Sequence, residues 1–191
     1  MATWHLEPPL SEERVRELRA GDLVYLDGTL MGLRDATLIR MFDEGVAAPT
    51  DLAGSVCLHT APGVKREGDR YEKVSIGTTT STRMNRFTEG LVVQYGVRAV
   101  AGKGGLLADM TEVLARHGAV YLGLVGGTAA ASTVQIEEIE AVWWEDLMPE
   151  CLWRFRVRDF GPLIVGVDAH GRNLYLDSKA KALKRLRARF E

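Results

Sequence analysis

A run of small and hydroxylated residues, Gly77-Thr78-Thr79-Thr80-Ser81-Thr82-Arg83, has the composition of an anion-binding loop. Hydroxyl groups and free backbone N–H groups at the start of a helix bind anions. The arginine at its end adds a planar guanidinium that binds carboxylates through two parallel hydrogen bonds. Helix capping beside a solvated arginine is the alternative interpretation, although three consecutive threonines exceed what capping requires.

Two further cations occupy comparable positions. Lys103 lies within the run Gly102-Lys103-Gly104-Gly105, and Arg34 precedes Asp35 where a loop meets a predicted helix. The glycine run is not a Walker A loop, because the earlier glycine of that motif would fall on Val97. A tight turn explains its glycines but not its lysine, and helix N-capping explains Asp35 but not Arg34.

All three cations follow predicted strands. In open α/β sheets the loops after the strand C-termini gather at one edge and bind ligands there. We therefore predict that Arg34, Arg83 and Lys103 bind a small dicarboxylate. His59, at the end of a predicted strand, can face the same edge, but the four histidines lack metal-ligand spacing. The sequence has no Gly-x-Ser-x-Gly elbow, so it predicts a substrate cradle without a complete catalytic apparatus.

The elements that must position these residues alternate between strand and helix. Strands are expected at 23–26, 55–59, 71–76, 97–101 and 119–124, and helices at 35–44, 80–94 and before Gly118. After about residue 135 strands dominate, at 138–143, 154–157, 163–167 and 173–176. The pattern predicts a mixed α/β fold in one domain, 1–191, with a core at about 6–176 and a basic C-terminal helix at 177–191.

Composition narrows the function classes. The chain has 191 residues, 46% of them hydrophobic, and a net charge of -2. This charge gives no indication of binding to nucleic acid or to an anionic membrane. No apolar run approaches the ~20 residues that span a bilayer, and the N-terminus lacks a leader pattern, so a cytoplasmic protein is expected. The two cysteines, Cys57 and Cys151, are expected to be reduced and buried.

The order and spacing of these motifs resemble the β domain of class I fumarate hydratases and the β subunit of L(+)-tartrate dehydratases, which are iron–sulfur hydro-lyases. The likeness runs from about residue 6 to residue 176. The segments that carry it are Val24–Leu30 leading to Arg34-Asp35, Val74–Met84, Gly102–Gly105, and Phe160–Val165 through to Asn173-Leu174.

The resemblance implies a single swivelling β/β/α domain that works only with a larger α subunit, in an α2β2 assembly. That partner would carry a [4Fe–4S] cluster on three cysteines, with one iron acting as a Lewis acid, and the present chain would bind no metal. Together they would hydrate or dehydrate a small dicarboxylate reversibly. By matching position, Arg34, Arg83 and Lys103 would bind the substrate carboxylates, and Thr79, Thr80 and Asp35 would be catalytic, with Thr79 as the base.

Two positions depart from the family pattern. Thr78 replaces a proline that usually precedes the threonines, and Leu38 stands where many members carry a histidine. A leucine can neither transfer protons nor bind a carboxylate. The choice between fumarate/malate and L-tartrate/oxaloacetate therefore stays open. The alternative function is a non-catalytic dicarboxylate-binding or assembly subunit.

Overall fold

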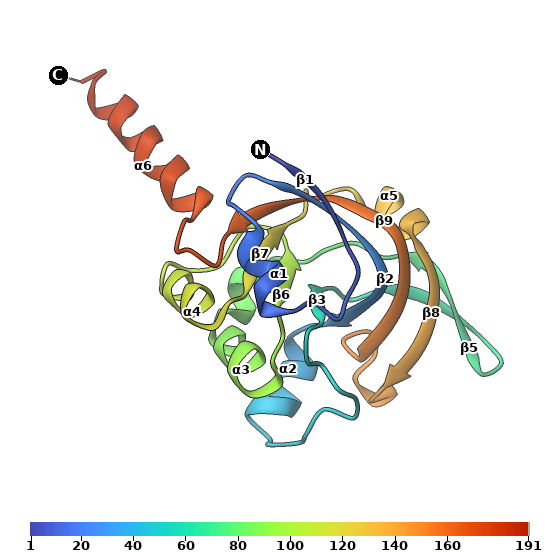
Figure 1. Ribbon diagram of the computed structural model, residues 1–191. Coiled ribbons are helices and arrows are strands. Elements are labelled where there is room, and N and C mark those ends of the chain that lie inside the picture. Colours follow the sequence, from blue (N-terminus) through green and yellow to red (C-terminus); the bar gives the residue numbers. More distant parts are fainter. Residues whose placement is uncertain (191) are drawn as a thin grey trace.

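The sheet of this protein closes on itself. In the computed structural model, which describes residues 1–190, strands β2, β3, β6 and β7 are parallel neighbours, and β9 runs antiparallel to β7 and pairs again with β2. The result is a ring of strands with β1 and β8 added to it outside the ring (Figure 1). The strand bounds are β1 Thr3–Leu6, β2 Leu23–Leu33, β3 Val56–His59, β6 Ala99–Gly102, β7 Val120–Gly123, β8 Ile136–Trp143 and β9 Leu152–Val167.

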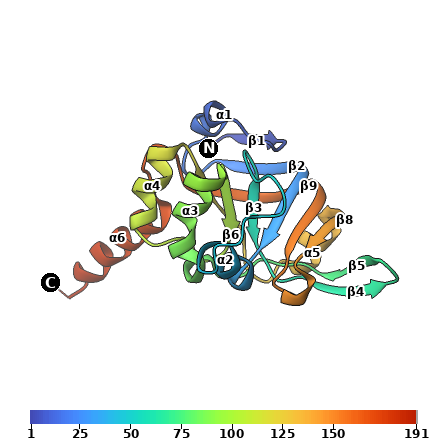
Figure 2. The ribbon, with the colours of Figure 1, turned by 90° about the horizontal axis from the view of Figure 1, so that it is seen from below.

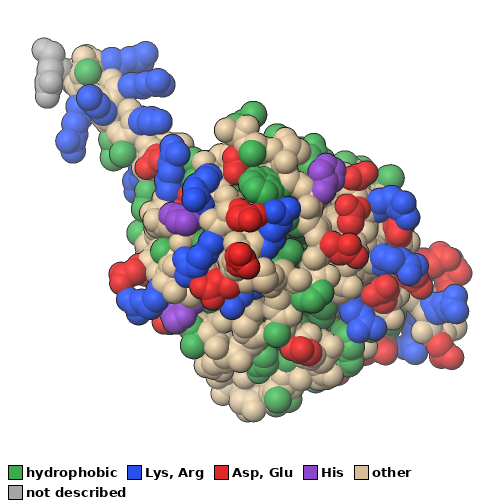
Figure 3. All heavy atoms as spheres, viewed as in Figure 1, with side chains coloured by type: hydrophobic (Ala, Val, Ile, Leu, Met, Phe, Trp, Pro, Cys, Tyr) green, Lys and Arg blue, Asp and Glu red, His purple; other side chains and the backbone are tan. Residues whose placement is uncertain are grey.

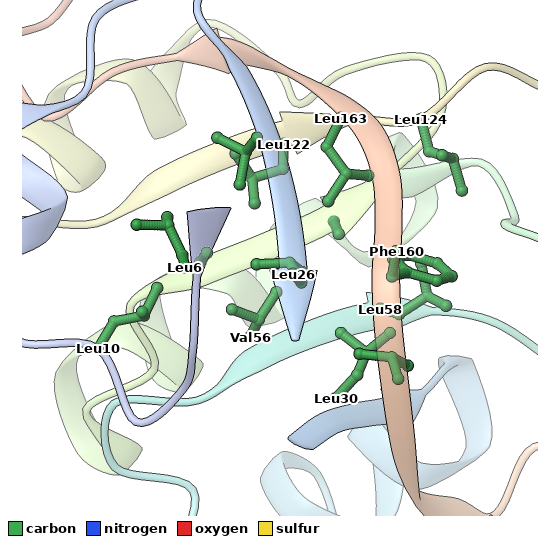
Figure 4. Packing of buried hydrophobic residues seen from close by; sticks show 14 of the residues in the cluster. Leu6, Leu10, Leu26, Leu30, Val56, Leu58, Leu122, Leu124, Phe160 and Leu163 are labelled. Atoms are coloured by element: carbon green, nitrogen blue, oxygen red, sulfur yellow. The ribbon is translucent and has the colours of Figure 1, made fainter. Parts of the chain in front are cut away.

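The short parallel strands are buried along their whole length, as expected where both faces of a sheet are covered. Their side chains alternate between two cores. Val56 and Leu58 belong to the core inside the ring, whereas Cys57 belongs to the core beneath the helices. In Figure 4, Leu30, Leu58 and Phe160 from three different strands meet in the inner core.

Helices cover the outer side of the parallel strands. Figure 2 shows α2, α3 and α4 on one flank of the ring and the hairpin of β4 and β5 projecting from the other. Two of these helices, α3 and α4, end at left-handed glycines, Gly96 and Gly118. The remaining bounds are α1 Glu12–Glu17, α2 Asp35–Phe42, β4 Gly63–Glu67, β5 Arg70–Ser75, α3 Asn85–Tyr95, α4 Asp109–His117, α5 Ala129–Gln135 and α6 Leu174–Arg187, with 3-10 turns at Ser81–Met84 and Glu145–Leu147.

The mixed α/β prediction is confirmed, but several element predictions are wrong. The strands expected at 154–157 and 163–167 are one strand, β9. The strand expected at 173–176 is the start of α6, because the Asn173 side chain accepts the N–H groups of Tyr175 and Leu176 and caps a helix there. The helix predicted at 177–191 is therefore the continuation of α6, and residue 191 lies outside the described residues.

Helix α6 stands away from the body, and none of its side chains is buried. Lysine and arginine side chains gather along it in Figure 3. Within residues 1–190, no helix combines the length and the apolar character needed to cross a membrane.

Candidate active site

The predicted anion-binding segments meet at the C-terminal ends of three adjacent parallel strands. Arg34 follows β2, His59 ends β3, and Lys103 follows β6. The register places Leu33 opposite His59 and Leu58 opposite Ala101, so these ends lie level with one another. Their shared edge positions the site.

The threonine-rich loop is held between these strand ends by main-chain hydrogen bonds. The N–H of Thr79 donates to the carbonyl of His59 over 2.8 Å, and the N–H of Lys103 donates to the carbonyl of Thr79 over 3.2 Å. Ser81 N–H donates in turn to the Lys103 carbonyl over 2.9 Å. The loop lies here because Gly102 has no side chain, since a Cβ at Gly102 would collide with Ser81 Oγ.

Four of the predicted residues form one chain of contacts. Arg34 Nε lies 3.0 Å from Asp35 Oδ2, and Arg83 Nη2 lies 3.5 Å from the same oxygen. Arg83 Nη2 also donates to Thr79 Oγ1 over 3.0 Å. One carboxylate thus holds two guanidinium groups, each of which keeps further N–H donors for a ligand. The Arg83 side chain is 48% exposed, so the site is open in this chain.

Lys103 and Thr80 join the site through the backbone. Thr80 and Lys103 pair as a parallel bridge, and Thr80 is exposed. The lysine side chain extends beside Gly126, where an added Cβ would lie 3.2 Å from Lys103 Cδ. Within residues 1–190 the Lys103 ammonium makes no hydrogen bond or ion pair, which leaves its three donors available to a ligand.

Glu150 is a site neighbour that the sequence did not identify. Its Oε1 lies 3.3 Å from Arg34 Nε, and its Oε2 accepts the N–H of Ala36 over 2.8 Å. The N-cap of α2 is therefore not Asp35, as expected, but Arg34, which makes no side-chain capping bond. Glu150, from a distant part of the chain, accepts the free N–H of Ala36 at the start of α2 in place of a capping side chain. The Asp35 carboxylate therefore remains available to bind the two arginines.

A second layer of polar residues supports the glycine loop. The hydroxyl of Tyr121 donates to Ser81 Oγ over 3.0 Å and accepts the Gly105 N–H over 3.3 Å. Asn85 Oδ1 accepts the N–H of Leu107 over 2.8 Å. No sequence pattern linked these partners, although a tyrosine in the otherwise aliphatic strand β7 was an available signal.

Comparison with known proteins identifies the family. The family model described as Fumarase C-terminus matches residues 2–178. The chain belongs to this family. It is 41% identical to the L(+)-tartrate dehydratase subunit beta of Escherichia coli K12 over 175 residues, which cover 91% of this chain and 87% of that protein.

Two further relatives of this Fumarase C-terminus chain differ in how they are built. The putative L(+)-tartrate dehydratase subunit beta of Methanocaldococcus jannaschii is 35% identical over 93% of both chains. The putative class I fumarate hydratase of Geobacillus stearothermophilus is 37% identical, and the match covers 95% of this chain but only 35% of that protein. The latter therefore carries about two thirds of its length outside this family unit. Both names describe enzymes that add or remove water.

The cysteines of this Fumarase C-terminus chain do not fit an iron–sulfur cluster. Cys57 and Cys151 are free and buried, as predicted. Burial raises the pKa of Cys57 to about 12 and that of Cys151 to about 11, and the two side chains lie in separate core clusters, so they do not form one ligand set. Cluster ligands are thiolates. The single potential metal-binding group within residues 1–190 is His5, Asp27 and Asp159, which lie on strands β1, β2 and β9 rather than on the site loops.

Leu38 has a structural explanation. Its side chain is fully buried in the core beneath the helices, together with Met41 and Met84. A side chain at this position faces packed apolar residues in this protein. Position 38, where the family resemblance led us to expect a histidine, thus serves core packing here.

Proposed function

We propose that this chain is the β subunit of a two-subunit hydro-lyase that hydrates or dehydrates a small dicarboxylate. The observation that carries the proposal is the contact chain Arg34–Asp35–Arg83–Thr79, which joins two carboxylate-binding cations to a hydroxyl. Lys103 adds a third cation without a partner among the described residues.

In this proposal Arg34, Arg83 and Lys103 bind the two substrate carboxylates. Asp35 holds the two arginines so that their remaining N–H groups face the substrate. Prearranged donors of this kind position a substrate without reorganisation during the reaction. Glu150 Oε1 lies 3.3 Å from the same Nε of Arg34 and helps to fix this side chain.

Thr79 Oγ1 is the proposed base. In the dehydration direction its deprotonated form takes a proton from the carbon beside one carboxylate. The C–H electron pair forms the double bond as the C–O bond on the neighbouring carbon breaks, and the hydroxide that leaves takes up a proton and is released as water. A threonine alkoxide is normally too unstable for this task. The hydrogen bond from the Arg83 guanidinium to Oγ1 stabilises the charged form over the neutral one. Thr80 lies beside it, exposed, as a second hydroxyl of the catalytic loop.

The proposed partner is a larger α subunit that carries the [4Fe–4S] cluster, in an α2β2 complex. Two observations support a partner. The cysteines of this chain do not fit a cluster, and the Geobacillus relative carries this unit within a much longer polypeptide. We propose that residues 1–191 form a single domain. A swivelling movement of this domain against the α subunit would close the open site. We propose a cytoplasmic location because both thiols are free.

The second candidate is a dicarboxylate-binding or assembly subunit without catalysis. Leu38 favours it, because an apolar side chain stands where the family resemblance leads us to expect a histidine. The two functions differ in whether this chain binds dicarboxylates alone.

Reconstitution distinguishes the candidates. The chain is expressed alone and with its α partner, and each preparation is assayed with fumarate, L-malate and L-tartrate. The hydro-lyase proposal predicts turnover only in the complex, on one of these substrates. Tight dicarboxylate binding by the isolated chain, with no turnover after addition of α, would support the binding subunit instead.

A further inference from the structure

His59 is a buried residue of the site edge whose polar atoms have no partner. Its side chain is fully buried, yet neither Nδ1 nor Nε2 makes a hydrogen bond within residues 1–190. A buried polar group without a partner destabilises the folded state, because its hydrogen bonds to water are lost and not replaced. Such groups call for an explanation, such as an ordered water or a functional contact.

His59 lies where the three site segments meet. The main chain of His59 pairs with Leu33, directly before Arg34, and its carbonyl accepts the Thr79 N–H over 2.8 Å. The ring lies over Gly102, directly before Lys103, because a Cβ added to Gly102 would be 3.4 Å from Nδ1.

Ser81 borders the same space and has a hydroxyl proton to donate. A Cβ added to Gly102 would collide with Ser81 Oγ and lie 3.4 Å from His59 Nδ1, so these two atoms border the same small space. Ser81 Oγ accepts the Tyr121 hydroxyl over 3.0 Å, while its own proton has no acceptor within residues 1–190. An unpartnered ring nitrogen at that place is a suitable acceptor.

The ring is neutral in the folded protein. Burial lowers the pKa of His59 to about 4, and the nearby Asp35 carboxylate opposes this effect only in part. A neutral imidazole has one donor and one acceptor. If Nδ1 accepts from Ser81, Nε2 carries the proton and needs an acceptor. Asp35 follows two residues after Leu33, the β2 residue that pairs with His59, and its charge raises the pKa of this ring.

We propose that His59 is a positioning residue of this site, whose Nδ1 accepts a hydrogen bond from Ser81 and whose Nε2–H donates to Asp35, in each case after a small side-chain rotation or through an ordered water. The buried Tyr121–Ser81 pair is thereby connected to the carboxylate that holds Arg34 and Arg83. Residues that hydrogen-bond to substrate-binding groups, without touching the substrate, orient those groups. The consequence for activity rests on the proposed function, whereas the hydrogen bonds themselves do not.

The hydrogen bonds are tested by NMR on the full chain with ¹⁵N-labelled histidine. Long-range ¹H–¹⁵N correlation spectra report which ring nitrogen is protonated, and the His59→Gln variant assigns the signal. We expect the Nε2–H form, a shifted Nδ1 resonance in Ser81→Ala and a shifted Nε2 resonance in Asp35→Asn. Ser55→Ala, which removes a buried hydroxyl bonded to the Leu52 carbonyl, should leave both resonances unchanged. An Nδ1–H ring, or a ring that responds to neither site variant, would overturn the proposal.

The positioning role is tested in the complex with the α subunit. His59→Leu should lower kcat/KM about 10- to 100-fold, as loss of a supporting hydrogen bond typically does. His59→Gln, which keeps a neutral donor and acceptor, should recover most of that loss. Equal activity in both variants and wild type contradicts the role. If no substrate is turned over by the wild-type complex, the proposed function fails while the NMR result still decides the hydrogen bonds.

Discussion

The guanidinium of Arg83 donates to the hydroxyl of Thr79 over 3.0 Å, across the first turn after the threonine-rich loop. The same nitrogen lies 3.5 Å from Asp35, which follows a different strand. Arg83 therefore links a proposed proton-transfer group to a proposed substrate-binding cluster. This relationship explains why an arginine and several threonines occur together in one short segment.

Replacing Thr79 with valine should lower kcat of the complex about 10²- to 10⁴-fold, the usual contribution of a positioned general base. Valine keeps the shape and the main-chain hydrogen bonds of residue 79, so KM and the melting temperature should change little. Steady-state kinetics on the reconstituted complex provide the measurement. Thr50→Val serves as the control, because Thr50 borders a groove with Pro8, Pro9 and Thr29 that none of the proposed site residues lines. Unchanged kcat in Thr79→Val would remove Thr79 from the mechanism.

Tyr121→Phe should destabilise the chain by about 1–3 kcal/mol, because Ser81 and the buried Gly105 N–H both lose a hydrogen-bond partner. Urea unfolding measures the change in the free energy of unfolding. Tyr95→Phe is the matched control, since the Tyr95 hydroxyl makes no hydrogen bond within residues 1–190. Equal stability of the two variants would show that the hydroxyl network under the glycine loop contributes nothing.

The sequence predicted the residues that carry the proposed chemistry, but not the residues that hold them in place. Arg34 and Lys103 could be placed together because each follows a parallel strand, and such strands end at one edge. The prediction for Thr79 rested on the same rule, but β5, the strand before it, pairs antiparallel with β4 in a separate sheet. Tyr121 is 40 residues from Ser81 in sequence, and Glu150 is 114 residues from the Ala36 N–H that it accepts. Contacts of that separation depend on the tertiary structure, and no local pattern encodes them.

The same limit applies to the fold. Local periodicity located the parallel strands because their apolar runs are short and bounded by turns. The sequence pattern divided β9 in two near Gly161-Pro162, because these residues ordinarily end a strand. The pairing with β2, which keeps β9 continuous, depends on the tertiary structure and leaves no local pattern. Likewise, the sequence pattern missed α5, whose small residues carry no amphipathic pattern.

Stability should fall on acidification through the pKa range of His59. The folded-state pKa of about 4 lies below the ordinary value of 6.5, because burial disfavours the charged ring more than the Asp35 carboxylate favours it. Between these values the unfolded chain binds a proton that the folded chain does not. The contribution of neutral His59 to the free energy of unfolding is therefore complete above about pH 6.5. It is lost as the pH falls towards 4, and the loss is at most about 3 kcal/mol.

This pH dependence is measured as the difference in the free energy of unfolding between wild type and His59→Leu from pH 7 to pH 4. Subtraction cancels the carboxylates that both proteins share. These include Asp43, whose pKa is lowered by its hydrogen bond with Arg86 and which acts mainly at lower pH. A constant difference across the range would mean that His59 is not held neutral by burial.

The hydro-lyase account depends most directly on Arg83. In the complex with the α subunit, Arg83→Ala should lower kcat/KM by about 2–5 kcal/mol in transition-state stabilisation, on the order of 30- to several-thousand-fold, because a charge-assisted contact with a substrate carboxylate is lost. Arg86→Ala, which removes an exposed arginine paired with Asp43 near the same helix start, is the matched control and should retain wild-type kcat/KM. Wild-type kcat/KM in Arg83→Ala would contradict the account.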